Sequence, residues 1–158
     1  MFRVGELVCD NVHKHNHAVL IKNVRVTGDG SVLEVLLPKS KTDQSGQGCV
    51  VALPQVQSHI CPVRLFKLYW AICPKSPGLL FRHFGGGPVT RFQFSAVLNK
   101  ALSALGINGR LYKSHSFRIG AASAASAAGL SEDSIKNMGR WESSAYKSYV
   151  RVPTPQLL

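Results

Sequence analysis

The sequence has few acidic residues. Its 158 residues include 8 aspartates and glutamates against 19 lysines and arginines, which gives a formal net charge of +11. Such an excess of positive charge favours a polyanionic partner, with nucleic acid the first candidate and an anionic membrane surface the second. A basic protein with no specific anionic partner is the alternative that charge alone leaves open.

Long apolar runs and paired cysteines are also missing. No stretch approaches the roughly 18 apolar residues of a membrane-spanning helix, and the N-terminus "MFRVGELVCD" lacks the layout of a signal peptide. The 4 cysteines are scattered without a CxxC pair, which disfavours a zinc site and indicates reduced thiols in an intracellular protein. The histidines of "HKHNH", residues 13–17, fit a polar turn better than a metal site, so we expect no metal.

The remaining composition and patterning predict one domain of the α+β class, mainly helical. Hydrophobic residues make up 45% of the chain, which is enough for a real core. β-Branched runs separated by turn-forming residues predict a small three-stranded antiparallel sheet over residues 18–26, 32–38 and 48–54. Helical periodicity and capping residues predict helices in the first dozen residues, from Pro62 to near Pro74, and over residues 89–106, 114–130, 131–139 and 143–151.

The densest polar motif in the predicted helices is "HSFR". It places His115 and Arg118 three residues apart, on the same side of a helix, where both can reach one anion. Arginine offers a planar fork of donors suited to phosphate, and histidine adds a hydrogen bond or moves a proton. The pair alone is a weak motif, because any solvated helix can carry it.

The surrounding residues give the pair more weight. The stretch "HSFRIGAASAASAAGLSEDSIKNMGRW", with the tyrosines that follow it, resembles the C-terminal half of the tyrosine recombinase (phage-integrase-like) catalytic domain. In that family a helix opening with His-x-x-Arg is followed by a short helix, a glycine close to His or Trp, and a nucleophilic tyrosine. Arg118 and Trp141 are 23 residues apart, as expected of Cre-like members that use Trp. The "GRW" and "YVR" spellings look most like the recombinases of eukaryotic Crypton-type and DIRS-type mobile elements.

Two further family motifs have counterparts nearer the N-terminus. The segment "FRVGEL" resembles the early arginine motif and supplies Arg3 and Glu6. The segment "KSKTD" resembles the lysine-bearing turn between the second and third strands. It supplies Lys41, with Lys39 as the runner-up for the same role.

The resemblance implies contacts to the scissile phosphate of DNA. Arg3 and Arg118 are expected to bind its non-bridging oxygens from two sides, where fixed donors stabilise the developing charge. Trp141 is expected to add its indole N–H, which is a donor only. His115 is expected to contact the phosphate or to help move the proton of the nucleophile.

The resemblance also implies the proton transfers and the absence of cofactors. Lys41 is expected to protonate the departing 5′ oxygen, and Glu6 to orient the groups that contact the phosphate. Neither a metal nor a high-energy cofactor is expected, because the cationic side chains replace the metal and a 3′-phosphotyrosyl bond conserves the energy of the broken phosphodiester.

Two tyrosines compete for the role of nucleophile. Tyr149 lies eight residues after Trp141 and Tyr146 only five. The family spacing is one residue longer than that of Tyr149, and the "VR" that follows Tyr149 resembles the Tyr-Ile-Arg of Cre-like members. Tyr149 is therefore predicted to be the nucleophile and Tyr146 a packing residue on the same helix.

The expected partners and setting follow from the same resemblance. Residues 1–158 are expected to be a catalytic domain that lacks its first helices and the N-terminal DNA-clamp domain. The expected partner is double-stranded DNA, with a synaptic homotetramer on it and no membrane, in the nucleus of a eukaryote or otherwise in the cytoplasm. Two alternatives remain open: a truncated or domesticated DNA-binding relative without recombinase activity, and a type IB topoisomerase-like enzyme.

Overall fold

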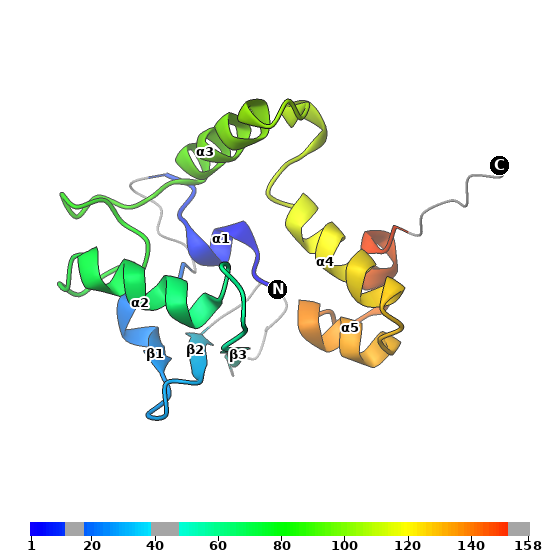
Figure 1. The fold of residues 1–158 in the computed structure, drawn as a ribbon, viewed down its shortest axis with the longest axis horizontal. Coiled ribbons are helices and arrows are strands. Elements are labelled where there is room, and N and C mark those ends of the chain that lie inside the picture. The colour runs from blue at the N-terminus through cyan, green and yellow to red at the C-terminus, as the bar shows by residue number, and fades with distance from the viewer. Residues whose placement is uncertain (12–17, 39–47, 152–158) are drawn as a thin grey trace. The chain divides into compact units, whose positions relative to one another are not determined.

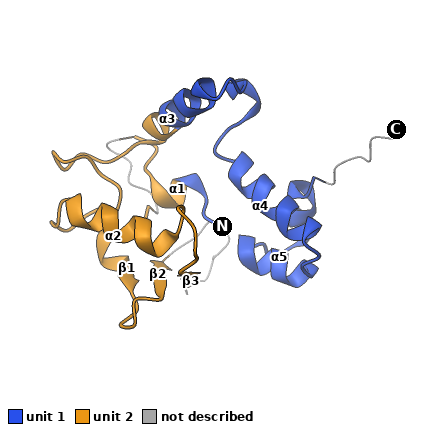
Figure 2. Cartoon of the chain, viewed as in Figure 1, with its two compact units in different colours: residues 1–4, 95–158 blue, residues 5–94 orange. Residues whose placement is uncertain are grey.

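The computed structural model describes residues 1–11, 18–38 and 48–151. These residues combine helices with one small sheet (Figure 1). By their contacts they form two compact units, one of Met1–Val4 with Ser95–Leu158 (unit 1) and one of Gly5–Phe94 (unit 2) (Figure 2). The first helix, α1 (Val4–Leu7), begins in unit 1 and continues in unit 2.

The sheet of unit 2 is three-stranded and antiparallel, in the order β1 (Val24–Val26), β2 (Val32–Leu37), β3 (Cys49–Pro54). Alternate side chains of β2 are buried, namely those of Leu33, Val35 and Leu37. This is the period of two that a strand with one covered face requires. The sheet confirms the predicted α+β class and its three-stranded antiparallel component.

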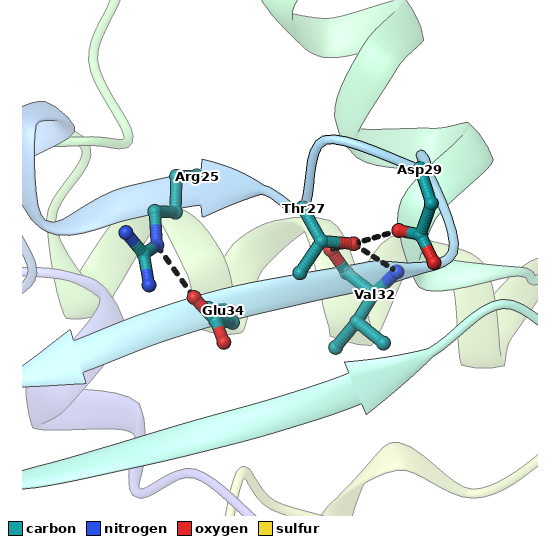
Figure 3. Close-up of polar contacts among 5 residues, drawn as sticks. All are labelled: Arg25, Thr27, Asp29, Val32 and Glu34. Carbon is teal, nitrogen blue, oxygen red and sulfur yellow. Dashed lines mark hydrogen bonds and ion pairs between the residues drawn. The ribbon is translucent and has the colours of Figure 1, made fainter.

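The turn between β1 and β2 is held by side chains (Figure 3). The Asp29 carboxylate accepts from the hydroxyls of Thr27 (2.5 Å) and Ser31 (2.6 Å), and the Thr27 oxygen accepts from the Val32 amide (3.0 Å). The hydrogen bond from the Ser31 hydroxyl, followed by that from Thr27, stabilises the charged carboxylate and lowers the pKa of Asp29 to about 2. Across the two strands, Arg25 pairs with Glu34 at 2.5 Å.

The predicted first strand is wrong in its first half. Leu20 makes only an isolated bridge with Leu79, and η1 (Ile21–Asn23) is a turn of 3-10 helix. The backbone of this segment bonds with residues 78–80 instead of β2: Ile21 donates to Gly78 (2.9 Å), and Val19 accepts from Leu80 (2.8 Å). A regular strand therefore begins only at Val24.

The helix of unit 2, α2 (Pro62–Ile72), packs on β2 and β3. It starts at a proline, whose missing N–H costs nothing at the first helical position, and it stops before Pro74, as predicted. Within this helix Val63 is fully buried, and the Tyr69 hydroxyl donates to the Leu80 carbonyl (2.6 Å).

Unit 1 contains the C-terminal part of α3 (Arg91–Ala104), η2 (Gly109–Leu111), α4 (Ser116–Ala127), α5 (Glu132–Gly139) and η3 (Ser144–Tyr149). Its core combines Ala122 and Ala125 of α4 with Ile135 of α5 and the rings of Trp141 and Tyr146. The small alanines let the large rings lie directly on α4.

The last predicted helix is a 3-10 helix, η3. Ser143 caps its start by accepting from the Ala145 amide (3.3 Å). In a 3-10 helix, residues three apart eclipse one another, so Tyr146 and Tyr149 share one face. None of the helices in the described ranges is long and apolar enough to cross a membrane.

Candidate active site

The start of α4 places the two polar side chains of "HSFR" very differently. His115, at the N-cap position, is exposed, whereas Arg118 is only 3% exposed. The Arg118 guanidinium donates from Nη1 to the Met1 carbonyl (2.8 Å) and from Nη2 to the Gly139 carbonyl (2.8 Å). Arg118 thus ties α4 to the end of α5 and to the first residues of the chain.

The rings of Trp141 and Tyr149 lie beside this guanidinium. Its central carbon is 4.4 Å from the Trp141 ring centroid and 5.6 Å from that of Tyr149, within cation–π range. The Tyr149 ring also lies edge-on to Trp141 (4.9 Å) and 4.7 Å from the His115 ring. Four residues predicted from the sequence, His115, Arg118, Trp141 and Tyr149, therefore lie together in unit 1.

Gly139 makes this arrangement of rings possible. A Cβ at position 139 would lie 1.7 Å from a carbon of the Trp141 ring, where no atom fits. The chain then turns sharply, because Arg140 adopts the left-handed conformation (φ 54°) and directs Trp141 back onto α5. The "GRW" stretch thus has a glycine for contact, a strained residue for the turn, and a tryptophan that fills the core.

Arg140 and Ser123 contribute to the site although no motif singled them out. Arg140 donates to the Met1 carbonyl (3.1 Å), so two guanidiniums converge on one oxygen. The Ser123 hydroxyl donates to the Tyr149 carbonyl (3.3 Å) and accepts from the Arg151 amide (2.8 Å). The position of Arg140 inside "GRW" was a usable signal, whereas nothing distinguished Ser123 from its Ala/Ser-rich neighbours.

The two tyrosines of η3 have different surroundings. Tyr146 is 3% exposed and belongs to the core of unit 1. Burial, reinforced by the nearby negative charge of Glu132, raises the pKa of Tyr146 to about 12. Tyr149 is half-buried and packs against the edge of the same core. Tyr146 is therefore a neutral core residue, and Tyr149 is the tyrosine beside the polar groups.

The residues predicted from the N-terminal motif fall in different units. Arg3 is half-buried in unit 1 and follows Met1 by two residues, a span of at most about 7 Å. Glu6 belongs to unit 2, where its side chain is buried and its carbonyl accepts from the Val19 amide (2.8 Å). Lys39 and Lys41, along with the histidines of residues 13–17, lie outside the described residues.

No family model, curated protein or solved structure matches this chain.

Proposed function

We propose that this chain is a tyrosine-recombinase-like DNA strand transferase with an integrase-like fold and Tyr149 as its nucleophile. The observation that carries the proposal is the convergence of the Tyr149 ring with His115, Arg118 and Trp141. These residues come from three separate segments of the chain. A tyrosine grouped with an imidazole and a guanidinium has the parts needed for metal-free phosphoryl transfer.

The proposed reaction conserves the phosphodiester. The Tyr149 oxygen forms a bond to phosphorus as the bond from phosphorus to the 5′ oxygen breaks. The phenol proton passes to His115 and the 5′ oxygen gains a proton from Lys41, which leaves a 3′-phosphotyrosine and a free 5′ hydroxyl. A 5′ hydroxyl of a second strand then attacks the phosphotyrosine and restores Tyr149. One phosphate ester is exchanged for another at each step, so no nucleotide cofactor is consumed.

The charge on the phosphate would be met by guanidiniums. Arg118 and Arg140 already converge on one oxygen atom, the carbonyl of Met1. In the proposal a non-bridging phosphate oxygen takes the place of this carbonyl, and Arg3 approaches from the adjacent backbone. Trp141 adds its indole N–H. The substrate is double-stranded DNA, in a synaptic tetramer, inside the cell and in the nucleus of a eukaryote.

One observation favours a second candidate, a DNA-binding relative without strand-transfer activity. Both terminal nitrogens of Arg118 donate to backbone carbonyls, which is how a purely structural arginine is used. If those bonds persist on DNA, Arg118 stabilises unit 1 and no phosphate reaches Tyr149.

A nicked suicide substrate separates the two candidates. It traps a strand transferase covalently, because the cleaved 5′ fragment diffuses away before it can rejoin. We expect a covalent band on a denaturing gel with the wild type, none with Tyr149→Phe, and an undiminished band with the control Tyr146→Phe. Binding of DNA by a wild type that forms no covalent band would favour the second candidate.

A further inference from the structure

Helix α3 has an apolar face that the described residues do not bury. Leu98 and Leu102 are four residues apart, which places them on one face of the helix, and Leu105 directly follows the end of the helix. No residue of this 14-residue helix is buried, and Leu105 is 73% exposed. Because helices in proteins owe most of their stability to packing of an apolar face, α3 needs a covering partner.

This face forms one wall of an open groove in unit 1. The groove has a volume of about 330 Å³ and runs between Leu98 and Leu102 of α3 and Phe117 and Gly120 of α4. Tyr112 lies in the connection between the helices, and the lining is almost wholly apolar. On α4 itself, Arg118 is buried on the side of the candidate active site, whereas Phe117 and Gly120 are exposed. The groove is thus separate from the rings of Trp141 and Tyr149.

The charged side chain in the wall of the groove is basic. Between Asp43 and Glu132 the sequence contains no aspartate or glutamate, whereas lysines and arginines occur throughout. Lys113 lies in the wall of the groove, and Arg110 is exposed on the turn η2 that precedes it. An acidic occupant would therefore be attracted to the rim, and a basic one repelled.

Two other occupants fit these observations less well. A second copy of the chain, paired by two-fold symmetry, would bring the same basic residues towards one another and oppose like charges. DNA would present phosphates to an apolar lining that offers few hydrogen-bond donors. The occupant that fits the groove best is therefore a protein surface with apolar anchors flanked by carboxylates.

We propose that the groove between α3 and α4 binds an amphipathic helix of a partner protein that carries leucine-like anchors flanked by aspartate and glutamate. Two helices that form an apolar groove commonly receive a third helix, whose anchors recur every three or four residues. This binding does not depend on the chemistry of Tyr149.

Gly120 offers a way to fill the groove. A Cβ at this position meets no atom within 4 Å, so a larger side chain can enter the groove without displacing the protein. Gly120→Leu fills the groove and Gly120→Ala leaves it open, while both replace the helical glycine. Gly120→Ala is therefore the matched control, and circular dichroism checks that both variants are folded.

The probe is a fluorescein-labelled synthetic helix with leucines at every third or fourth position and glutamates elsewhere, measured by fluorescence anisotropy. A second peptide has lysine in place of every glutamate. We expect the wild type and Gly120→Ala to bind the glutamate peptide at least tenfold more tightly than Gly120→Leu does. We also expect Lys113→Glu to weaken binding of the glutamate peptide several-fold and to strengthen binding of the lysine peptide.

Several results would overturn the proposal. They are failure of the wild type to bind the glutamate peptide, equal binding by Gly120→Leu, and equal preference for the lysine peptide. Sedimentation of the wild type as a dimer that Gly120→Leu disperses would assign the groove to a second copy instead. Displacement of the peptide by duplex DNA from wild type and Tyr149→Phe alike would assign it to nucleic acid.

Discussion

Gly139 and Trp141 are the residues on which the geometry of the candidate site depends. The indole packs against the α carbon of the glycine, and the same indole carries the contacts with Arg118 and Tyr149. Any side chain at position 139 must move the ring, and with it the site.

We therefore expect Gly139→Ala to destabilise the protein by about 1–3 kcal/mol, the usual range for overpacking a core. Gly120→Ala is the control, because the same change in a helix with open space should stabilise by about 0.5–1 kcal/mol. Urea unfolding of the wild type, Gly139→Ala and Gly120→Ala measures both changes in the free energy of unfolding. Equal effects of the two substitutions would contradict the packing described for Gly139.

Tyr146 makes the stability depend on pH at the alkaline end. Its pKa is raised from 10.0 to about 12, so the folded state holds the phenol proton more tightly than the unfolded state does. The stabilisation is complete below pH 10 and is lost as the pH rises towards 12. We expect the unfolding free energy of the wild type to fall more steeply over this range than that of Tyr146→Phe. Parallel curves for the two proteins would show that Tyr146 ionises normally.

Spacing alone distinguishes the two tyrosines. Counting from Trp141 favoured Tyr149 as the nucleophile, and the structure buries Tyr146 in the core of unit 1. The left-handed backbone conformation of Arg140 was not predictable, because that conformation usually favours glycine. The assignment of Tyr149 as the nucleophile stays a prediction until its chemistry is measured.

At the scale of elements, the turn between β1 and β2 rests on one carboxylate. Hydrogen bonds from Ser31 and Thr27 lower the pKa of Asp29 from 3.8 to about 2. The stabilisation is therefore present above about pH 4 and is lost as the pH falls towards 2.

We expect Asp29→Asn to remove this acid dependence. The difference in unfolding free energy between wild type and variant should shrink as the pH falls from about 4 to 2, as followed by urea unfolding at each pH. A difference that stays constant over this range would mean that the carboxylate titrates as it does in an unfolded chain.

Elements with local causes were predictable from the sequence. The alternation in β2, the proline that starts α2 and the glycine that follows α4 act within a few residues. Residues 18–23 were wrongly assigned to a strand because their β-branched composition says nothing about their partner. That partner is the segment of residues 78–80, and a contact across such a distance leaves no local pattern.

At the scale of the whole molecule, the net charge of +11 is the property most easily tested. We expect duplex DNA to bind with an affinity that falls linearly with salt on logarithmic axes, because each neutralised phosphate releases counterions. A duplex of the same sequence with methylphosphonates in place of phosphates is the control, and it should bind weakly. Equal affinity for both duplexes, or insensitivity to salt, would argue against a nucleic-acid partner.

The division into two units was not predictable from the sequence. Composition and length predicted one domain, and no proline-rich or glycine-rich linker marks a boundary at Phe94 and Ser95, inside α3. The proposed catalytic residues in the described ranges all belong to unit 1, namely Arg3, His115, Arg118, Trp141 and Tyr149. The predicted general acid, Lys41, belongs to the chain between β2 and β3 and stays a prediction.

The most direct test of the central claim is the identity of the residue that DNA captures. Trypsin separates the two candidates, because it cuts after Arg140, Lys147 and Arg151 and leaves Tyr146 and Tyr149 on different peptides. After trapping on a suicide substrate and nuclease digestion, mass spectrometry should find the nucleotide on the peptide of residues 148–151. A nucleotide on the peptide of residues 141–147, or on neither, would contradict the assignment of Tyr149 as the nucleophile.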